Sequence, residues 1–230
     1  MARILVVNPN SSHAVTQAMD ACLGSVRSGV AHEISCDTLE KSPLGIESDA
    51  HVLEVVPHIL ERIQGSRADA YVIACFSDPG LMQARAMTPK PVVGIAEAAY
   101  CLALGYGRRF GVLSILEASI PRHRNYIRAL GLSERFSGDR AIGLGVSQLH
   151  GGEVMERIIP IVTALRDQDR SDAIILGCAG LGAYRADLER SMGIPVIDPV
   201  QAGALLACSM VTLCPTGEAN RRPDCTSQHI

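Results

Sequence analysis

An internal repeat constrains the fold of this chain more than any other feature of its sequence. Residues 68–75 (ADAYVIAC) resemble residues 171–178 (SDAIILGC), so that Cys178 follows Cys75 by 103 residues. Buried strands draw on few residue types, and one such match can arise by chance. Asp69 and Asp172 occupy equivalent places within this match, and two further pairs outside it keep the spacing to within one residue: Pro57 with Pro160, and Pro91 with Pro195. Together the matches indicate two similar halves of about 100 residues each.

Short apolar runs alternate with helical patterns in both halves. Apolar runs that end in polar or glycine-rich turns are typical of buried parallel strands, and strand–helix alternation is typical of parallel sheets flanked by helices. We therefore predict an α/β fold of two pseudo-symmetric halves, each a parallel sheet flanked by helices, with the active site in the cleft between them. Strands are expected at residues 4–7, 32–36, 71–74, 91–95, 110–113, 174–176 and 194–197, and helices at 15–26, 51–63, 97–104 and 154–165.

The predicted domains follow the repeat. The first half covers residues 1–105, the second half covers residues 106–198, and a C-terminal helix at residues 199–214 can belong to the first half. Residues 215–230 form a polar tail that is expected to be disordered. Three signals mark where helices begin: Ser11 or Ser12 caps the first, Pro57 kinks or starts the helix at 51–63, and Ser119 caps a helix with Pro121 near its first position.

Composition excludes several classes of protein. Hydrophobic residues make up 47% of the chain, which is enough for a large buried core. A net charge of −3 and 3% aromatic residues give neither an electrostatic field for nucleic acid nor rings on which bases stack. No apolar run has the length of a membrane span, and the N-terminus lacks the apolar stretch of a signal peptide. We expect a soluble cytoplasmic protein without nucleic-acid or membrane partners.

The sequence offers no motif for a metal or an organic cofactor. Eight cysteines are present, but none forms a CxxC pair or has histidines at zinc-ligand spacing. Glycine-rich phosphate-binding motifs are missing as well. The lysines Lys41 and Lys90 lie close to prolines in expected loops, which argues against a pyridoxal Schiff base. We therefore predict that the protein uses no cofactor and no metal.

Two cysteines occupy equivalent positions of the repeat, each at the carboxyl end of an expected strand. Ligands of α/β proteins bind beyond these ends, so Cys75 and Cys178 are expected to meet across the cleft. Inversion at a carbon needs a base on one face and an acid on the other, and a thiolate and a thiol can supply both. Backbone N–H groups in the turns after Asn8, Cys75 and Cys178 can stabilise an enolate oxygen, and they can raise the thiolate fraction. The alternative is that both cysteines only pack in the core.

A basic patch on the helix after Ser119 is a weaker candidate for a binding site. It consists of Arg122, His123, Arg124 and Arg128. We interpret the patch as a solvent-facing surface, and the alternative is an entrance for anions.

Four motifs resemble those of the Asp/Glu/hydantoin racemase superfamily, in particular its hydantoin/allantoin racemase branch. They are NPNSS at residues 8–12, ACFSDPGL at residues 74–81, PVVGIAEA at residues 91–98 and GCAGL at residues 177–181. The resemblance covers about residues 3–205, and the stretch at 75–81 is its most specific part. It implies a cofactor-independent racemase with two pseudo-symmetric halves that assembles as a homo-oligomer, a tetramer or a hexamer.

The resemblance also implies roles for individual residues. Cys75 and Cys178 are the two acid/base residues, one from each half. Ser77 stands where family members often carry glycine, which predicts a narrower pocket or an added hydroxyl group. The substrate ring is surrounded, largely by backbone groups, by Asn8, Pro43, Ile46, Phe76, Ser77, Ala179, Gly180 and Leu181.

These features predict racemisation of a cyclic ureide, a 5-substituted hydantoin or allantoin, by proton transfer at C5 between two cysteines. One alternative is an aspartate or glutamate racemase, which needs a cationic clamp for the substrate carboxylate, and no arginine or lysine lies in the expected mouth loops. A second alternative is a non-catalytic small-molecule-binding protein of the same fold, which would bind a hydantoin without exchanging its hydrogen.

Overall fold

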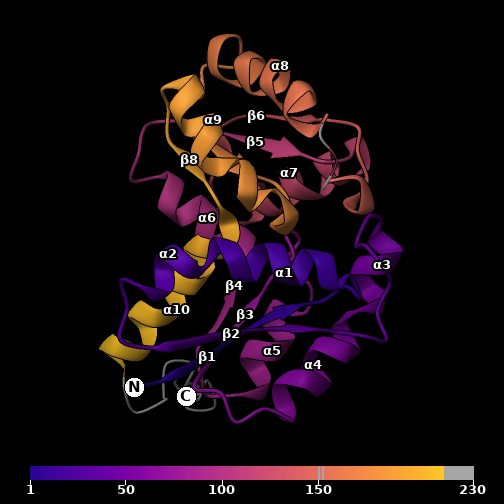
Figure 1. Ribbon diagram of the computed structural model, residues 1–230, viewed down its shortest axis with the longest axis vertical. Helices are drawn as coiled ribbons and strands as arrows, with labels where there is room; N and C mark the ends of the chain where they lie inside the picture. Colours follow the sequence, from indigo (N-terminus) through magenta and orange to yellow (C-terminus); the bar gives the residue numbers. More distant parts are fainter. Residues whose placement is uncertain (150, 152, 215–230) are drawn as a thin grey trace, which may run out of the picture.

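Two parallel four-stranded sheets, one in each lobe, form the framework of the computed structural model, which describes residues 1–149, 151 and 153–214 (Figure 1). The first sheet has the strand order β2-β1-β3-β4 and the second has the order β6-β5-β7-β8, so the two lobes share one topology. The six strand pairings are parallel. The predicted α/β fold with two similar halves is confirmed. The predicted tail at residues 215–230 lies outside the described residues.

The first sheet is buried on both faces, as its continuous apolar strands predict. Along β1, Ile4 and Val6 pack into one hydrophobic cluster while Leu5 and Val7 pack into another, because side chains alternate along a strand. This part of the chain contains β1 (Arg3–Asn8), α1 (His13–Cys22), α2 (Gly24–Arg27), β2 (Glu33–Thr38), α3 (Asp49–Glu54), α4 (Val56–Gln64), β3 (Ala70–Ile73), α5 (Leu81–Met87), β4 (Val92–Gly94) and α6 (Ile95–Ala103).

The second sheet repeats this order of elements with an edge strand that the sequence did not reveal. β6 is mostly polar (FSGDRA) and only half-buried, so it has no apolar run to detect. The elements are β5 (Phe110–Ser114), η1 (Glu117–Ser119), α7 (Ile120–Ala129), η2 (Ser133–Arg135), β6 (Phe136–Ala141), η3 (Val146–Gln148), α8 (Val154–Asp167), β7 (Ala173–Leu176), η4 (Ala179–Tyr184), α9 (Arg185–Met192), β8 (Val196–Ile197) and α10 (Pro199–Leu213).

Helix starts follow the local signals with one exception. The Ser12 side chain caps α1 by accepting a hydrogen bond from the backbone N–H of Val15. Pro57 lies in the first turn of α4, so it starts a new helix and does not kink a continuous one. The prediction that Ser119 caps the helix of Pro121 is wrong. Because the 3₁₀ turn η1 precedes α7, Ser119 is already helical, and its hydroxyl donates to the carbonyl oxygen of Leu116 at 2.7 Å.

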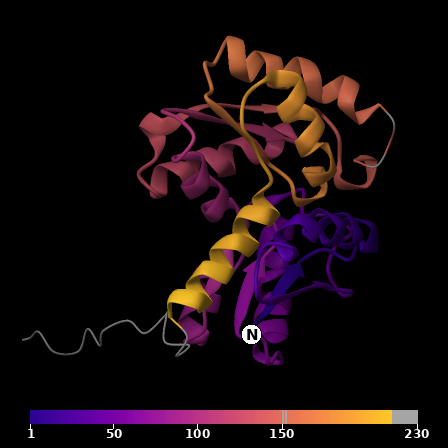
Figure 2. The ribbon, with the colours of Figure 1, turned by 60° about the vertical axis from the view of Figure 1, so that its left-hand side comes forward.

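The two lobes are joined by an exchange of helices. α6, which follows the first sheet, packs against β7 and β8 of the second sheet. α10, which follows the second sheet, packs along α6 and against β1, β3 and β4 of the first, and Figure 2 shows it running from one lobe to the other. One hydrophobic cluster therefore contains residues of both sheets. The sequence-based domain boundaries stay a prediction. None of the described helices is long and apolar enough to cross a membrane.

Candidate active site

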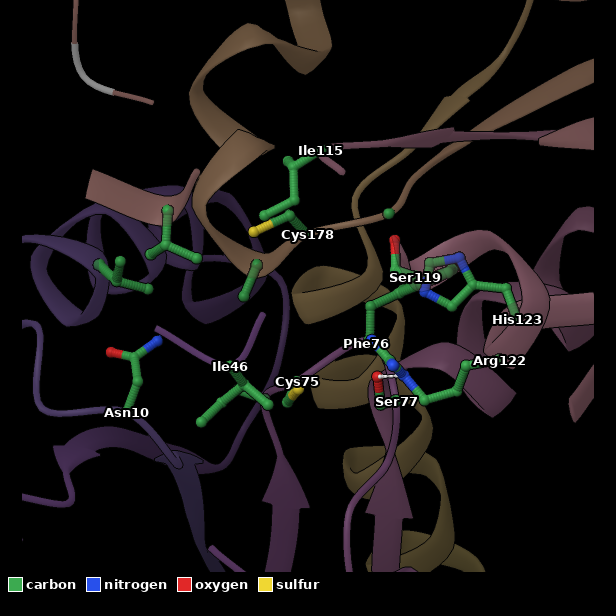
Figure 3. Close-up of a pocket in the computed structure, with 15 residues that line it drawn as sticks. Asn10, Ile46, Cys75, Phe76, Ser77, Ile115, Ser119, Arg122, His123 and Cys178 are labelled. Carbon is green, nitrogen blue, oxygen red and sulfur yellow. Dashed lines mark hydrogen bonds between the residues drawn. The ribbon is translucent and has the colours of Figure 1, made fainter. Parts of the chain in front are cut away.

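A cavity of about 40 Å³ lies between the lobes, beyond the carboxyl ends of β3 and β7. Cys75 and Cys178 both line it, and each stands two residues after the last residue of its strand. Figure 3 shows the two sulfur atoms on opposite sides of the cavity, each carried by a different lobe. The duplicated strand ends therefore bring both thiols to one enclosed space.

The same backbone geometry supports each sulfur. The N–H of Ser77 is hydrogen-bonded to the Cys75 sulfur, and the N–H of Gly180 is hydrogen-bonded to the Cys178 sulfur. In both cases the donor lies two residues after the cysteine, where the chain turns away from the strand. N–H groups aimed at a sulfur stabilise its thiolate form, so each turn favours the negative charge that a base needs.

Burial nevertheless determines the protonation of both thiols. It raises the pKa of Cys75 to about 11 and the pKa of Cys178 to about 12, against the lowering effect of the N–H donors. Asp78 also raises the pKa of Cys75 while Arg122 lowers it, and the neighbouring Cys75 raises the pKa of Cys178. The N–H groups of the turns thus favour the thiolate form, as expected, but burial has the larger effect and the pKa of each thiol is raised overall.

Asp78 connects the Cys75 turn to the start of α6. Its carboxylate accepts hydrogen bonds from the backbone N–H groups of Ala96 at 3.0 Å and Glu97 at 2.9 Å. Gly94 makes room for this contact, because a Cβ atom there would lie 2.2 Å from the carboxyl carbon of Asp78. Burial raises the pKa of Asp78 to about 7 even though it accepts these hydrogen bonds. The turn that carries Cys75 is thus fixed to a helix that packs on the other lobe.

The side of the cavity formed by α7 is polar. Arg122 donates from Nε to the hydroxyl of Ser77 at 2.8 Å and forms an ion pair with Asp49. His123 is buried, and its Nδ1 lies 2.8 Å from a carboxylate oxygen of Asp139. Both side chains line the cavity, so the interpretation of the basic patch as a solvent-facing surface is wrong for these two residues. Arg124 and Arg128 are exposed, as that interpretation predicts.

Comparison with known proteins places the chain in a family. The family model described as Asp/Glu/Hydantoin racemase matches residues 4–207. The chain belongs to this family. It is similar to the hydantoin racemase of Paenarthrobacter aurescens, with 35% identity over 92% of both chains, and to that of Rhizobium meliloti, with 36% identity over 89% of this chain and 86% of the relative.

A solved structure gives the same assignment. The allantoin racemase from Klebsiella pneumoniae superposes with a TM-score of 0.86 at 31% sequence identity, over 99% of this chain and 97% of that chain. The resemblance noted from the motifs is therefore confirmed, and this member of the Asp/Glu/hydantoin racemase family is an isomerase of the racemase type.

The racemase cavity contains some of the residues expected around the substrate and lacks others. Asn8 does not reach it, since its buried amide donates to Asn10, Ser12 and Thr16, and Asn10 lines the cavity in its place. Pro43 does not line the cavity either, and its carbonyl oxygen accepts a hydrogen bond from the backbone N–H of Ser11. Of the predicted residues, Cys75, Cys178, Ile46, Phe76, Ser77 and Ala179 line the cavity, whereas Asn8, Pro43, Gly180 and Leu181 do not.

Sequence reasoning missed the residues that the second lobe adds from outside the repeat motifs. Ile115 and Ser119 come from the segment after β5, and Val146 begins η3. The backbone N–H of Val146 donates to Glu47 at 2.7 Å, which ties the loop of Ile46 to the opposite lobe. No motif marks these positions, because packing between the lobes brings them together. Within the described part of the chain, no group of three or more His, Cys, Asp or Glu residues could hold a metal ion.

Proposed function

We propose that this racemase inverts the C5 stereocentre of a 5-substituted hydantoin or of allantoin, with Cys75 and Cys178 as its two acid/base residues and without a cofactor. One observation carries the proposal: equivalent cysteines from the two halves line one cavity from opposite sides. The substrate class is supported by the relatives, which are hydantoin racemases at 35% and 36% identity and an allantoin racemase at 31%.

The proposed reaction moves two protons and needs no oxidant or reductant. One cysteine, as the thiolate, removes the C5 proton, and the electron pair moves onto the adjacent carbonyl oxygen to give an enolate. The other cysteine, as the thiol, donates its proton to the opposite face of C5 and becomes a thiolate. The reactive form of the enzyme has one thiol and one thiolate before and after the reaction, so the reverse reaction uses the same groups with exchanged roles.

Single substitutions of the two cysteines test this scheme. In Cys75→Ser and Cys178→Ser, we expect racemisation to fall by at least about 100-fold, because a serine hydroxyl is a far weaker acid than a thiol. Racemisation is followed by polarimetry, and proton removal by deuterium uptake at C5 from each enantiomer separately. Each variant is expected to exchange hydrogen with one enantiomer at most.

The control is Cys101→Ser, since Cys101 is exposed on α6 and does not line the cavity. It is expected to racemise like the unchanged protein. Near-native racemisation in either Cys75→Ser or Cys178→Ser would contradict the two-base scheme. The cytoplasmic location stays a prediction from the sequence composition, and the homo-oligomeric assembly stays a prediction from the resemblance.

One observation favours an alternative substrate class. Arg122 supplies the cavity with the cation that a carboxylate clamp needs, although it stands on α7 and not in a mouth loop. Aspartate and glutamate therefore belong in the same exchange assay. Exchange at their Cα, with none at C5 of any hydantoin, would favour the amino-acid racemase. Binding of a hydantoin without exchange would favour the non-catalytic binding protein.

A further inference from the structure

The proton transfer leaves two polar side chains of the cavity without a role. Arg122 and His123 both reach it from α7, and Figure 3 shows them together on one side, with Phe76 and Ser77 next to them. Neither is one of the two thiols. They lie where a substituent of the bound ring could extend away from the sulfur atoms.

Arg122 is held in position and still has hydrogen atoms to donate. Its side chain is 18% exposed, and its contacts use Nε toward Ser77 and Nη1 toward Asp49. Among the described residues, Nη2 donates to no protein acceptor. A guanidinium fixed by two contacts presents its remaining N–H groups in a defined plane, which suits a carbonyl or carboxylate oxygen.

His123 is fixed just as firmly, and its contacts determine which of its nitrogens is available. A carboxylate can only accept, so the hydrogen between the ring and Asp139 belongs to Nδ1. The Ser114 hydroxyl donates to the same carboxylate, and Phe76 contacts the imidazole edge-to-face with ring centroids 5.1 Å apart. With this hydrogen on Nδ1, the neutral form of the ring carries a lone pair on Nε2, and Nε2 makes no hydrogen bond with the described residues.

A donor and an acceptor that line the same cavity can together bind an amide-like group. We infer that Arg122 and His123 bind the C5 substituent of the substrate, and that this substituent carries a carbonyl oxygen beside an N–H, as a ureido or a carbamoyl group does. The guanidinium donates to the carbonyl oxygen, and the substituent's N–H donates to Nε2 of His123. This assignment rests on the proposed function and names the substituent that the same site selects.

Other substituents fit this pair less well. An apolar group would leave Nη2 of Arg122 and Nε2 of His123 without partners after displacing water from them, which is costly for buried polar groups. A carboxylate would satisfy Arg122 but bring a second oxygen lone pair toward the lone pair of Nε2. The site is therefore expected to discriminate by hydrogen bonding, which gives larger selectivity than one methylene in an apolar pocket.

Four hydantoins test the inference. Allantoin carries a ureido group and 5-carbamoylmethylhydantoin a carbamoyl group, while 5-carboxymethylhydantoin and 5-isobutylhydantoin are similar in size but anionic and apolar. The readout is the ratio of kcat/KM for the carbamoylmethyl compound to that for the isobutyl compound. We expect this ratio to be at least about 10 in the unchanged protein.

Arg122→Met keeps the length of the side chain and removes its donors, and we expect it to lower the ratio at least about tenfold. Arg122 also lowers the pKa of the Cys75 thiol, and its removal would therefore change the rate for every substrate. This change cancels in the ratio of two substrates, so the ratio reports only how the substituent is bound. Arg124→Met, on the exposed face of α7, is the matched control and should leave the ratio unchanged.

His123→Gln is a second variant. Its test is the ratio of kcat/KM for the carbamoylmethyl compound to that for the carboxymethyl compound, and we expect this ratio to fall.

The results separate this inference from the proposed function. If none of the four hydantoins exchanges its C5 hydrogen, the proposed function fails and the inference fails with it. If 5-isobutylhydantoin reacts as fast as the carbamoylmethyl compound, or Arg122→Met leaves their ratio unchanged, only the inference is overturned. Preference for the carboxymethyl compound would also overturn it, because the site would then select charge alone. A higher rate for allantoin than for the carbamoylmethyl compound would identify the ureido group as the preferred form.

Discussion

At the scale of residues, the two cysteines have the same backbone surroundings and different charged neighbours. Each sulfur is hydrogen-bonded to the N–H two residues on, which follows from the repeat. Cys75 has Asp78 and Arg122 nearby, whereas Cys178 has Glu47, which raises its pKa further. Both pKa values lie above the ordinary value of 9.0, so at neutral pH the resting enzyme holds both groups mainly as thiols.

The raised pKa values determine how activity depends on pH. The proton is removed by a thiolate, and with pKa values of about 11 and 12 the thiolate fraction increases about tenfold per pH unit well below them. We therefore expect log kcat/KM for a hydantoin to rise across pH 6–9 with a slope near 1 and no plateau. The measurement is the initial rate of racemisation by circular dichroism, with enzyme-free blanks at every pH. A plateau or a maximum below pH 8 would contradict the assigned protonation.

At the scale of elements, two buried carboxylates hold the helices that the lobes exchange. Asp78 caps α6 from the Cys75 turn, and Asp198 caps α10 as its own N-cap residue, accepting from the N–H groups of Val200 and Gln201. Burial raises the pKa of Asp78 to about 7 and that of Asp198 to about 6. The starts of α6 and α10 are equivalent in the repeat, and a buried carboxylate caps each of them. In α6 the carboxylate comes from the Cys75 turn, and in α10 it comes from the N-cap residue itself.

The raised pKa of Asp78 makes stability depend on pH. Between its ordinary pKa of 3.8 and about 7, the folded protein holds a proton that the unfolded chain has lost. The contribution of Asp78 to the free energy of unfolding therefore falls as pH rises from 4 through 7, by about 4 kcal/mol in all, and levels off above about pH 8. Asp78→Asn is expected to remove this part of the slope in urea unfolding at pH 4.5–7.5.

The control for Asp78→Asn is the same substitution at a carboxylate that is not buried. Asp187→Asn on α9 is suitable, because that side chain is 66% exposed. It should unfold with the same pH dependence as the unchanged protein. Parallel curves for Asp78→Asn and the unchanged protein would show that Asp78 is ionised in the folded state throughout this range.

The elements also show what the sequence could and could not predict. The strand ends at Cys75 and Cys178 follow from local apolar runs, and the repeat indicates that they are equivalent. The position of His123 was missed although a signal existed: it stands three residues after Ile120 and four before Ile127, so all three share the buried face of α7. The cavity-facing position of Arg122 carries no such signal, because its contacts with Ser77 and Asp49 exist only after the lobes have packed together.

At the scale of the whole molecule, the site depends on how the lobes are held together. The two sulfur atoms belong to different lobes, so their separation depends on how the lobes pack together. Contacts between the lobes include α1 against η4, next to Cys178, and α6 against the second sheet, and α10 packs along α6 and against the first sheet. Gly203 lies where α10 crosses α6. A Cβ atom there would lie 3.0 Å from side-chain carbons of Ile95 and Val72, so the absence of a side chain allows the close approach.

Gly203→Val is therefore expected to push α10 away from the first sheet and to disturb both stability and activity. Overpacking of this kind costs about 1–3 kcal/mol, which lowers Tm by about 2–12 °C in a chain of this size. Leu205→Val places the same β-branched residue on the exposed face of α10 and serves as the control. We expect Gly203→Val to lose kcat at temperatures where it is still folded, because a shift between the lobes changes the distance over which the thiols must reach C5. A destabilised Gly203→Val with unchanged kcat would mean that the spacing of the thiols is set within the cavity walls and not by the exchanged helices.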